Sequence, residues 1–314
     1  MAYYNVNRVI KLTRKALGLT QEKLSEGICE VETYSRIENG RRTIRRSTYR
    51  KLMEKMGRIA DRRYAVCVSK DGMLLEEKVE LERAFKRYDY EAAEKYLKIL
   101  KEKADDNLLT RQYIARVDAL VEYRCKRITA KELAVRLDAA LRMTVPEYET
   151  YMNSGRTFAF FVEEIQLLMN LGNAYRRSKD FDESIHVYKY ILRCLEENYI
   201  GEPIRTNLYI TIVNSISAVY EILGKYQDAI SQLDVCLELV AQNDYGHLIP
   251  VLMSAKAYNI MRLVDDKCMG NDNIIEAKKI SQYAFYIATA RCDANSISRI
   301  DKFYREFMEN DDFK

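Results

Sequence analysis

Five arginines fall within a short stretch of the chain, at positions 36, 41, 42, 45 and 46. A guanidinium can bind guanine O6 and N7 with two hydrogen bonds, which is worth about 1–3 kcal/mol of discrimination against other bases. Arginines on a loop reach phosphates without reading base sequence. Arg36 is therefore the best candidate for base recognition, and Arg41, Arg42, Arg45 and Arg46, on the loop expected to follow it, are candidates for phosphate contacts. A run of charge can also be a solvated surface and no more, so these assignments depend on the elements that carry them.

Two short helices joined by a glycine turn are expected to position these side chains. Thr20 is a hydroxyl N-cap for a first helix that ends at Gly27, where a positive φ allows a tight turn. A second helix is expected from about Glu30 to Glu38, and Gly40 ends it in the left-handed conformation. In a helix-turn-helix, the second helix lies in the DNA major groove while the first braces against the backbone. The pattern predicts that duplex DNA is the ligand.

The stretch from about Asn7 to Gly57 resembles the lambda-repressor-like (XRE) helix-turn-helix domains. The residues that carry the resemblance are Arg14, Gly18, Leu19, Thr20, Gln21, Leu24, Gly27, Ser35, Arg36, Ile37, Glu38, Asn39 and Gly40. It implies that Gln21 holds a phosphate and that Arg14 and Glu38 form a structural ion pair. It further implies groove-facing or backbone-contacting positions at Val31, Glu32, Ser35, Arg36 and Asn39.

Glu32 has two interpretations. Its carboxylate could accept a hydrogen bond from a cytosine amino group. A carboxylate near phosphates is costly unless it is paired, so Glu30 and Glu32 could instead repel wrong sequences or favour the helix N-terminus. Both interpretations stay open from the sequence.

The charge of the chain is divided unevenly along its length. Residues 1–66 hold 16 Lys and Arg against 7 Asp and Glu, a net charge of +9, and the rest hold 35 against 40, or −5. A surface that binds a polyanion therefore belongs at the N-terminus. The seven cysteines form no CxxC pair and stand beside only two histidines, so we expect small apolar core residues and no metal site or cofactor. The sequence contains no Walker, HExxH or GxSxG motif and no apolar run of the ~18 residues that span a membrane, so neither an enzyme nor a membrane protein is expected.

Beyond the first domain a helical pattern recurs. An aromatic residue precedes a small one by three positions, and large inward positions follow four and seven residues after the small one, which puts all of them on one helical face. The aromatic and small residues are Tyr90 and Ala93, Phe181 and Ser184, and Tyr226 and Ala229. With small residues such as Gly172 and Ser217 on the helix upstream of the second and third, this is the tetratricopeptide (TPR) pattern of paired helices.

The spacing of these segments predicts the rest of the repeat array. Since 91 residues separate Tyr90 from Phe181 and 45 separate Phe181 from Tyr226, an intermediate pair is expected at 107–126 and 129–143. A last pair is expected at 247–266 and 273–290, with a capping helix at about 296–309. The fold class is therefore all-α, a lambda-repressor-like helix-turn-helix domain followed by a TPR-like α-solenoid. We place the DNA-binding domain at 1–66, a linker at 67–78 and the repeat domain at 79–314.

A DNA-binding module followed by extended repeats resembles the Rgg/PlcR/NprR (RRNPP) peptide-sensing regulators, as does the GIC turn at 27–29. That resemblance implies that a short signalling peptide binds in the repeat groove. Asparagine can bind both the amide and the carbonyl of an extended peptide, and arginine suits a carboxylate. The candidate peptide-binding residues are Asn170, Asn173, Arg176, Arg177, Asn207, Thr211, Asn214, Tyr258 and Asn259. Any one of these asparagines could instead be an ordinary solvent-facing residue.

The sequence therefore predicts a cytoplasmic transcriptional regulator that binds operator DNA, as a homodimer, under the control of a short peptide. The alternative is a TPR interaction protein that holds a partner such as a response regulator, with DNA binding secondary. DNA binding that is indifferent to peptides, together with a stoichiometric protein partner, would favour the alternative.

Overall fold

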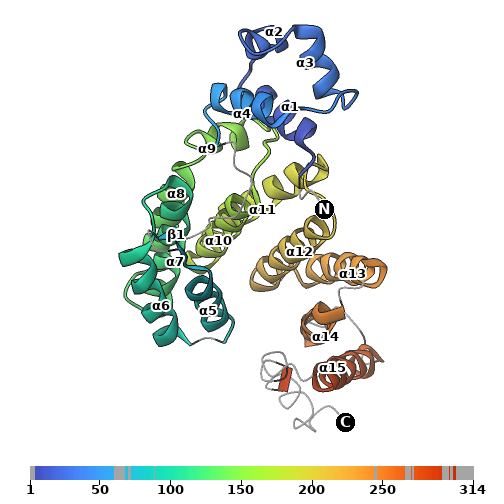
Figure 1. Ribbon diagram of the computed structural model, residues 1–314. Helices are drawn as coiled ribbons and strands as arrows, with labels where there is room; N and C mark the ends of the chain where they lie inside the picture. Colours follow the sequence, from blue (N-terminus) through green and yellow to red (C-terminus); the bar gives the residue numbers. More distant parts are fainter. Residues whose placement is uncertain are drawn as a thin grey trace. The chain divides into compact units, whose positions relative to one another are not determined.

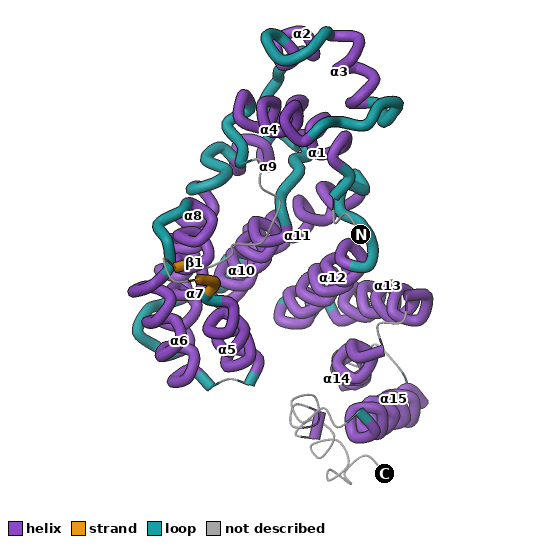
Figure 2. Tube along the Cα trace, viewed as in Figure 1, coloured by secondary structure: helices purple, strands orange, loops and turns teal. Residues whose placement is uncertain are grey.

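The computed structural model describes residues 4–59, 68–69, 72–87, 89–243, 246–265, 270, 272–291, 297 and 300–301. Over these residues the chain is almost entirely helical, which confirms the all-α prediction (Figures 1 and 2). The exception is a hairpin of two strands, β1 (Val68–Ser69) and β2 (Gly72–Met73), paired antiparallel with Val68 opposite Met73. Each strand has two residues, too few for the alternation of apolar and polar side chains by which a strand is recognised.

The chain divides into two compact units, Met1–Gly201 and Glu202–Lys314. The first unit contains both the predicted DNA-binding segment and the first six long repeat helices. Its first four helices are α1 (Val6–Ala16), α2 (Gln21–Ser25), α3 (Val31–Glu38) and α4 (Arg46–Lys55). The expected domain boundary at residue 66 lies outside the described residues and stays a prediction.

The remaining helices pack mainly with their neighbours in sequence. In the first unit they are α5 (Leu75–Lys86), α6 (Tyr90–Lys103), α7 (Leu108–Arg124), α8 (Ala130–Arg142), α9 (Tyr148–Asn153), α10 (Val162–Ser178) and α11 (Phe181–Glu196). In the second they are α12 (Ile204–Ile222), α13 (Tyr226–Asn243), the 3-10 turn η1 (Gly246–Leu248), α14 (Ile249–Asp265) and α15 (Asp272–Ala290). The pairs are α5 with α6, α7 with α8, α10 with α11, α12 with α13 and α14 with α15.

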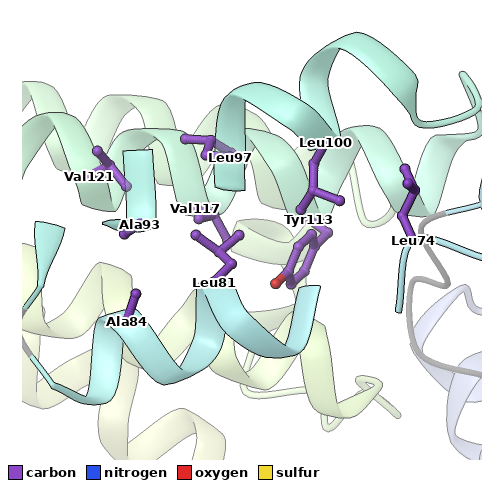
Figure 3. Packing of buried hydrophobic residues seen from close by; sticks show 9 residues of the cluster. All are labelled: Leu74, Leu81, Ala84, Ala93, Leu97, Leu100, Tyr113, Val117 and Val121. Atoms are coloured by element: carbon purple, nitrogen blue, oxygen red, sulfur yellow. The ribbon is translucent and has the colours of Figure 1, made fainter. Parts of the chain in front are cut away.

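The repeat spacing predicted the inward positions correctly. The small residues Ala93, Ser184 and Ala229 are all buried, and so are the large residues that follow them by four and seven positions. In the first pairs, side chains of α5, α6 and α7 converge on one apolar cluster that includes Leu81, Leu97 and Val117 (Figure 3). Burial of such side chains is the main favourable contribution to folding.

Three features of the repeats differ from the prediction or fall outside it. The helix α5, the partner of α6, is not evident in the sequence because only Leu81 and Ala84 along it are fully buried between charged residues. The short helix α9 was not predicted either. Of the expected capping helix at 296–309, residues 297, 300 and 301 are helical, with Ile300 packed on Ala284 and Ala288, and the others lie outside the described residues.

The close approach of α10 to α11 depends on Gly172. A Cβ atom at this position would lie 2.7 Å from a ring carbon of Tyr188, so the Gly172→Ala variant has to displace a buried ring. We expect a destabilisation of about 1–3 kcal/mol from this overpacking, of which a helix propensity gain of about 0.5–1 kcal/mol offsets part. Urea unfolding curves measure the change. In a Tyr188→Leu background the same glycine replacement should cost much less, and an equal cost in both backgrounds would contradict this account of Gly172.

Candidate functional sites

The turn between α2 and α3 has the geometry of a helix-turn-helix. The Thr20 hydroxyl caps α2 by accepting from the Lys23 N–H at 3.2 Å. Gly27 then takes a φ of +74°, which a side chain would strain, and the chain turns into α3 two residues after Cys29. Leu24, Tyr34 and Ile37 are buried beneath the two helices. These observations confirm the expected element order.

The C-terminus of α3 ends in a left-handed glycine, as predicted. Gly40 has a φ of +73°, and its N–H donates to the Ile37 carbonyl at 3.0 Å. The N–H of Arg41 donates to the Arg36 carbonyl at 2.8 Å, which completes a Schellman motif. The motif reverses the chain at Asn39, so that the arginines that follow lie beside the recognition helix.

A buried ion pair fixes α3 to α1. The guanidinium of Arg14 binds the carboxylate of Glu38 at 2.7 and 3.1 Å, and the Glu38 side chain is only 1% exposed. The Tyr34 hydroxyl donates to the same carboxylate at 3.1 Å, and so does the side-chain amide of Gln21. The structural role implied for Arg14 and Glu38 is confirmed. The Gln21 amide keeps a second N–H, with which it could donate to a phosphate.

The Glu38 carboxylate gives the domain a pH dependence. Burial alone would raise its pKa, but the hydrogen bonds from Arg14 and Gln21 outweigh burial, and the pKa lies below the ordinary value of 4.5. A carboxyl with a lowered pKa stabilises the fold above its unfolded pKa, and the stabilisation is lost as the pH falls through the folded pKa. We expect the unfolding free energy of the native chain to fall more steeply below pH 4.5 than that of the Glu38→Gln variant. Hydrogen exchange of α1 and α3 across this range measures the difference, and parallel slopes would refute it.

The predicted DNA-contacting side chains of α3 reach solvent to different extents. Glu32, Arg36 and Asn39 are exposed, and Val31 and Ser35 are half-buried. Asn39 lies 3.5 Å from the Ser35 hydroxyl, at the limit of a hydrogen bond. The Arg36 side chain has no hydrogen bond or ion pair to any described residue, so its guanidinium is free to bind a ligand.

The four arginines after α3 do not all lie on a loop. Arg41 and Arg42 do, but Arg45 is the N-cap residue of α4 and Arg46 is its first helical residue. The expectation of a loop through Arg46 is therefore wrong at its end, because α4 begins there without a hydroxyl or carboxamide cap to mark it in the sequence. All four side chains are exposed, and Arg42 donates to the Thr33 hydroxyl at 3.2 Å.

The N-terminal segment matches a known domain family. Residues 10–59 match the helix-turn-helix family model, and they contain the α2–α3 turn and the arginines described above. These residues are a helix-turn-helix domain. No curated protein matches the sequence.

Solved structures similar to the chain extend the comparison beyond the helix-turn-helix domain. PlcR from Bacillus thuringiensis, solved with the peptide PapR7 and DNA, is 17% identical with a TM-score of 0.55, over 94% of this chain and 99% of PlcR. The apo form of PlcR is 13% identical with a TM-score of 0.57, over 96% and 99%. ComR from S. thermophilus, solved with DNA and its signalling peptide ComS, is 12% identical with a TM-score of 0.52, over 96% and 99%. The chain therefore has the fold of these proteins over nearly its whole length.

The candidate peptide-binding residues of the first unit lie on α10. Asn170 and Asn173 are half-buried, Arg177 is exposed, and their spacing of three and four residues puts them on one face. The Asn173 amide donates to the Met169 carbonyl at 3.0 Å and its oxygen accepts from Arg176 at 3.3 Å. The guanidinium of Arg177 lies 5.6 Å from the centre of the Tyr123 ring on α7.

The candidates of the second unit divide into two groups. Asn207, Thr211 and Asn214 are half-buried on one face of α12, where the Thr211 hydroxyl donates to the Asn207 carbonyl at 2.8 Å. On α14, Tyr258 is half-buried, but Asn259 is 0% exposed, which differs from the expected groove-lining position.

The surroundings of Asn259 explain its burial. The amide donates to the Ala255 carbonyl at 2.8 Å and to Glu221 at 3.2 Å, while the side-chain oxygen has no partner among the described residues. Asn259 is held by these contacts inside the second unit. The spacing that suggested a groove position cannot distinguish the outer edge of a helix face from its buried centre.

Two further features were tested over the described residues. No helix among them is both long and apolar enough to cross a bilayer. Nor do three or more of their His, Cys, Asp or Glu side chains gather as a metal ion would require.

Proposed function

We propose that this chain is a cytoplasmic transcriptional regulator that binds specific operator DNA through residues 10–59, as a homodimer, under the control of a short signalling peptide. The observation that carries the DNA-binding part is a set of exposed arginines in a helix-turn-helix domain. Arg36 projects from α3, and Arg41, Arg45 and Arg46 surround the start of α4 without a partner among the described residues. No part of the proposal requires a catalytic activity.

The placement of Arg45 and Arg46 supports a phosphate ligand. A helix N-terminus carries partial positive charge, so cations there cost about 0.3–1 kcal/mol, whereas anions are stabilised. The first turn of α4 holds no acidic residue to compensate. A phosphate of the DNA backbone would satisfy the arginines and the free N–H groups of α4 together.

Selection of bound fragments from a random duplex pool tests sequence recognition. Full-length protein is expected to enrich a motif with two half-sites spaced by whole helical turns, ~34 Å or a multiple. The Arg36→Ala variant should lose preference at one position of each half-site, since a bidentate arginine to guanine contact is worth about 1–3 kcal/mol. An unchanged motif with Arg36→Ala would remove Arg36 from base recognition, and no enriched motif with native protein would contradict the proposed function.

The control by peptide rests on the fold shared with PlcR and ComR, both of which were solved with a peptide and DNA. In the first unit, we propose Asn170, Asn173, Arg176 and Arg177 as peptide contacts. In the second unit, we propose Asn207, Thr211, Asn214 and Tyr258, with Asn259 behind them in the interior. A peptide that binds one conformation of the repeats better than another shifts the population of that conformation, and with it the affinity for DNA.

Native mass spectrometry of the protein purified from its own cells tests the peptide ligand. We expect a bound mass of a few residues, and its synthetic copy should change the affinity for the selected operator. Protein that carries no peptide, and a DNA affinity that no cell extract fraction of low mass changes, would contradict peptide control. A stoichiometric protein partner found instead would support the interaction protein.

A further inference from the structure

The first unit contains a pocket that none of the predicted contacts explains. It has a volume of about 550 Å³ and lies between α1, the turn after α3 and the end of α11. Its walls include Asn7, Lys11 and Lys15 of α1, Asn39 at the end of α3, and Glu197 after α11. The pocket therefore lies beside the recognition helix of the helix-turn-helix domain.

The wall formed by α1 is basic. Arg8, Lys11 and Lys15 are spaced by three and four residues, so they share one face of the helix, and all three line the pocket. The guanidinium of Arg8 donates to the Glu197 carbonyl at 2.6 Å, which ties α1 to the end of α11. Lys11 and Lys15 have no hydrogen bond or ion pair to any described residue. The pocket thus holds two ammonium groups without a counter-ion.

The acidic side chains on the wall do not neutralise these cations. Glu38 is already paired with Arg14, and the pair carries no net charge. Glu197 accepts a hydrogen bond only from the Thr157 hydroxyl, at 3.1 Å, so it keeps its charge. Three positive side chains therefore face one unpaired carboxylate, which leaves the pocket with an excess of two positive charges.

We propose that this pocket binds a phosphate group. Lysine, arginine and asparagine are the usual donors to phosphate in proteins that bind nucleic acids, and the excess charge suits an anion of charge −1 to about −2. The phosphate can come from the DNA backbone or from a free phosphate-bearing molecule. The first source rests on the proposed function, and it is the one that the position of Asn39 and Gly40 favours, since Arg41 and Arg42 follow them directly.

The closing experiment uses the full chain with Lys11→Gln and Lys15→Gln combined. The two replacements remove charge at solvent-accessible positions without removing a buried contact. The matched control combines Lys103→Gln and Lys131→Gln, two exposed lysines of the repeat helices without ion pairs to described residues. Both variants change the net charge equally, so non-specific attraction to a polyanion falls equally in both.

The first arm measures binding to a labelled random-sequence duplex over a range of salt concentrations. If the pocket holds a backbone phosphate, the slope of log K against log salt falls by about 0.9 per phosphate lost in the pocket variant and not in the control. The second arm measures Tm with inorganic phosphate against chloride at matched ionic strength. If the phosphate is free in solution, it raises the Tm of native and control protein and not that of the pocket variant.

Either result supports the phosphate site and identifies its source. Equal slopes for the two variants together with no pocket-dependent change in Tm would overturn it. If no protein binds duplex at any salt concentration, the proposed DNA function fails. The Tm arm then decides the phosphate site on its own.

Discussion

Replacement of Arg58 by methionine is expected to destabilise the first compact unit by about 3–5 kcal/mol, because it leaves a buried carboxylate without its partner. Arg58 lies just after α4, and its guanidinium binds both oxygens of Glu164 on α10 at 2.9 Å. The two side chains are only 5% and 3% exposed. The guanidinium also donates to the Thr144 carbonyl at 2.7 Å and lies 4.9 and 5.1 Å from the ring centres of Phe158 and Phe161.

The control separates a lost charge pair from lost packing. Glu164 also accepts from the Phe161 N–H at 2.8 Å at the start of α10, and glutamine keeps an acceptor for that bond. Arg58→Met combined with Glu164→Gln should therefore recover much of the loss, because no charge remains buried. Arg127→Gln, which breaks an ion pair with Glu94 about half exposed on both sides, should cost at most about 1 kcal/mol. Hydrogen exchange localised to α4 and α10 reports the change, and a double variant as unstable as Arg58→Met would show that packing alone is responsible.

This ion pair also determines what the first helices of the two functional parts share. Glu164 lies in the first turn of α10, and the proposed peptide contacts Asn170, Asn173 and Arg177 lie further along the same helix. The Tyr4 hydroxyl accepts from the Val162 N–H at 2.9 Å at the same end. A displacement of α10 would therefore have to move or break its contacts with the DNA-binding segment, which is a physical route for coupling.

The sequence predicts local structure and faces well, because both depend on neighbours within a few residues. The turn at Gly27, the left-handed Gly40 and the buried faces of α6, α11 and α13 all follow from residue types at helical spacing. The same spacing predicts that Asn170 and Asn173 share one face. Such patterns report that a face is covered, and they carry no information on which residue covers it.

The parts that could not be predicted depend on partners far apart in the chain. Arg58 and Glu164 are 106 residues apart, and the periodicity of either helix gives no reason to pair them. The phosphate pocket joins Lys11 and Lys15 of α1 to the end of α11. The burial of Asn259 depends in the same way on Glu221 of another helix. Long-range contacts of this kind follow only from the packed structure.

Neutralisation of the four arginines around the start of α4 should nearly abolish the electrostatic part of DNA binding. Native protein that neutralises about four to six phosphates should lose affinity with a slope of log K against log salt near about −4 to −5. Glutamine at Arg41, Arg42, Arg45 and Arg46 removes up to four of those contacts, so the slope should fall to about −1. At low salt the affinity should fall by roughly 10²-fold or more, because each released counterion contributes. Fluorescence anisotropy of a labelled duplex measures both quantities.

The control has the same number of charges removed elsewhere. Glutamine at the exposed lysines Lys103, Lys131, Lys189 and Lys279 gives an identical net charge, and none of these lysines has an ion pair to a described residue. A general attraction between a basic protein and DNA would fall equally in both variants, whereas a defined interface is lost only with the arginines. The four arginine side chains are exposed, so the variant should unfold at the same urea concentration as native protein. An arginine variant that keeps the native slope would place the DNA-binding surface elsewhere on the molecule.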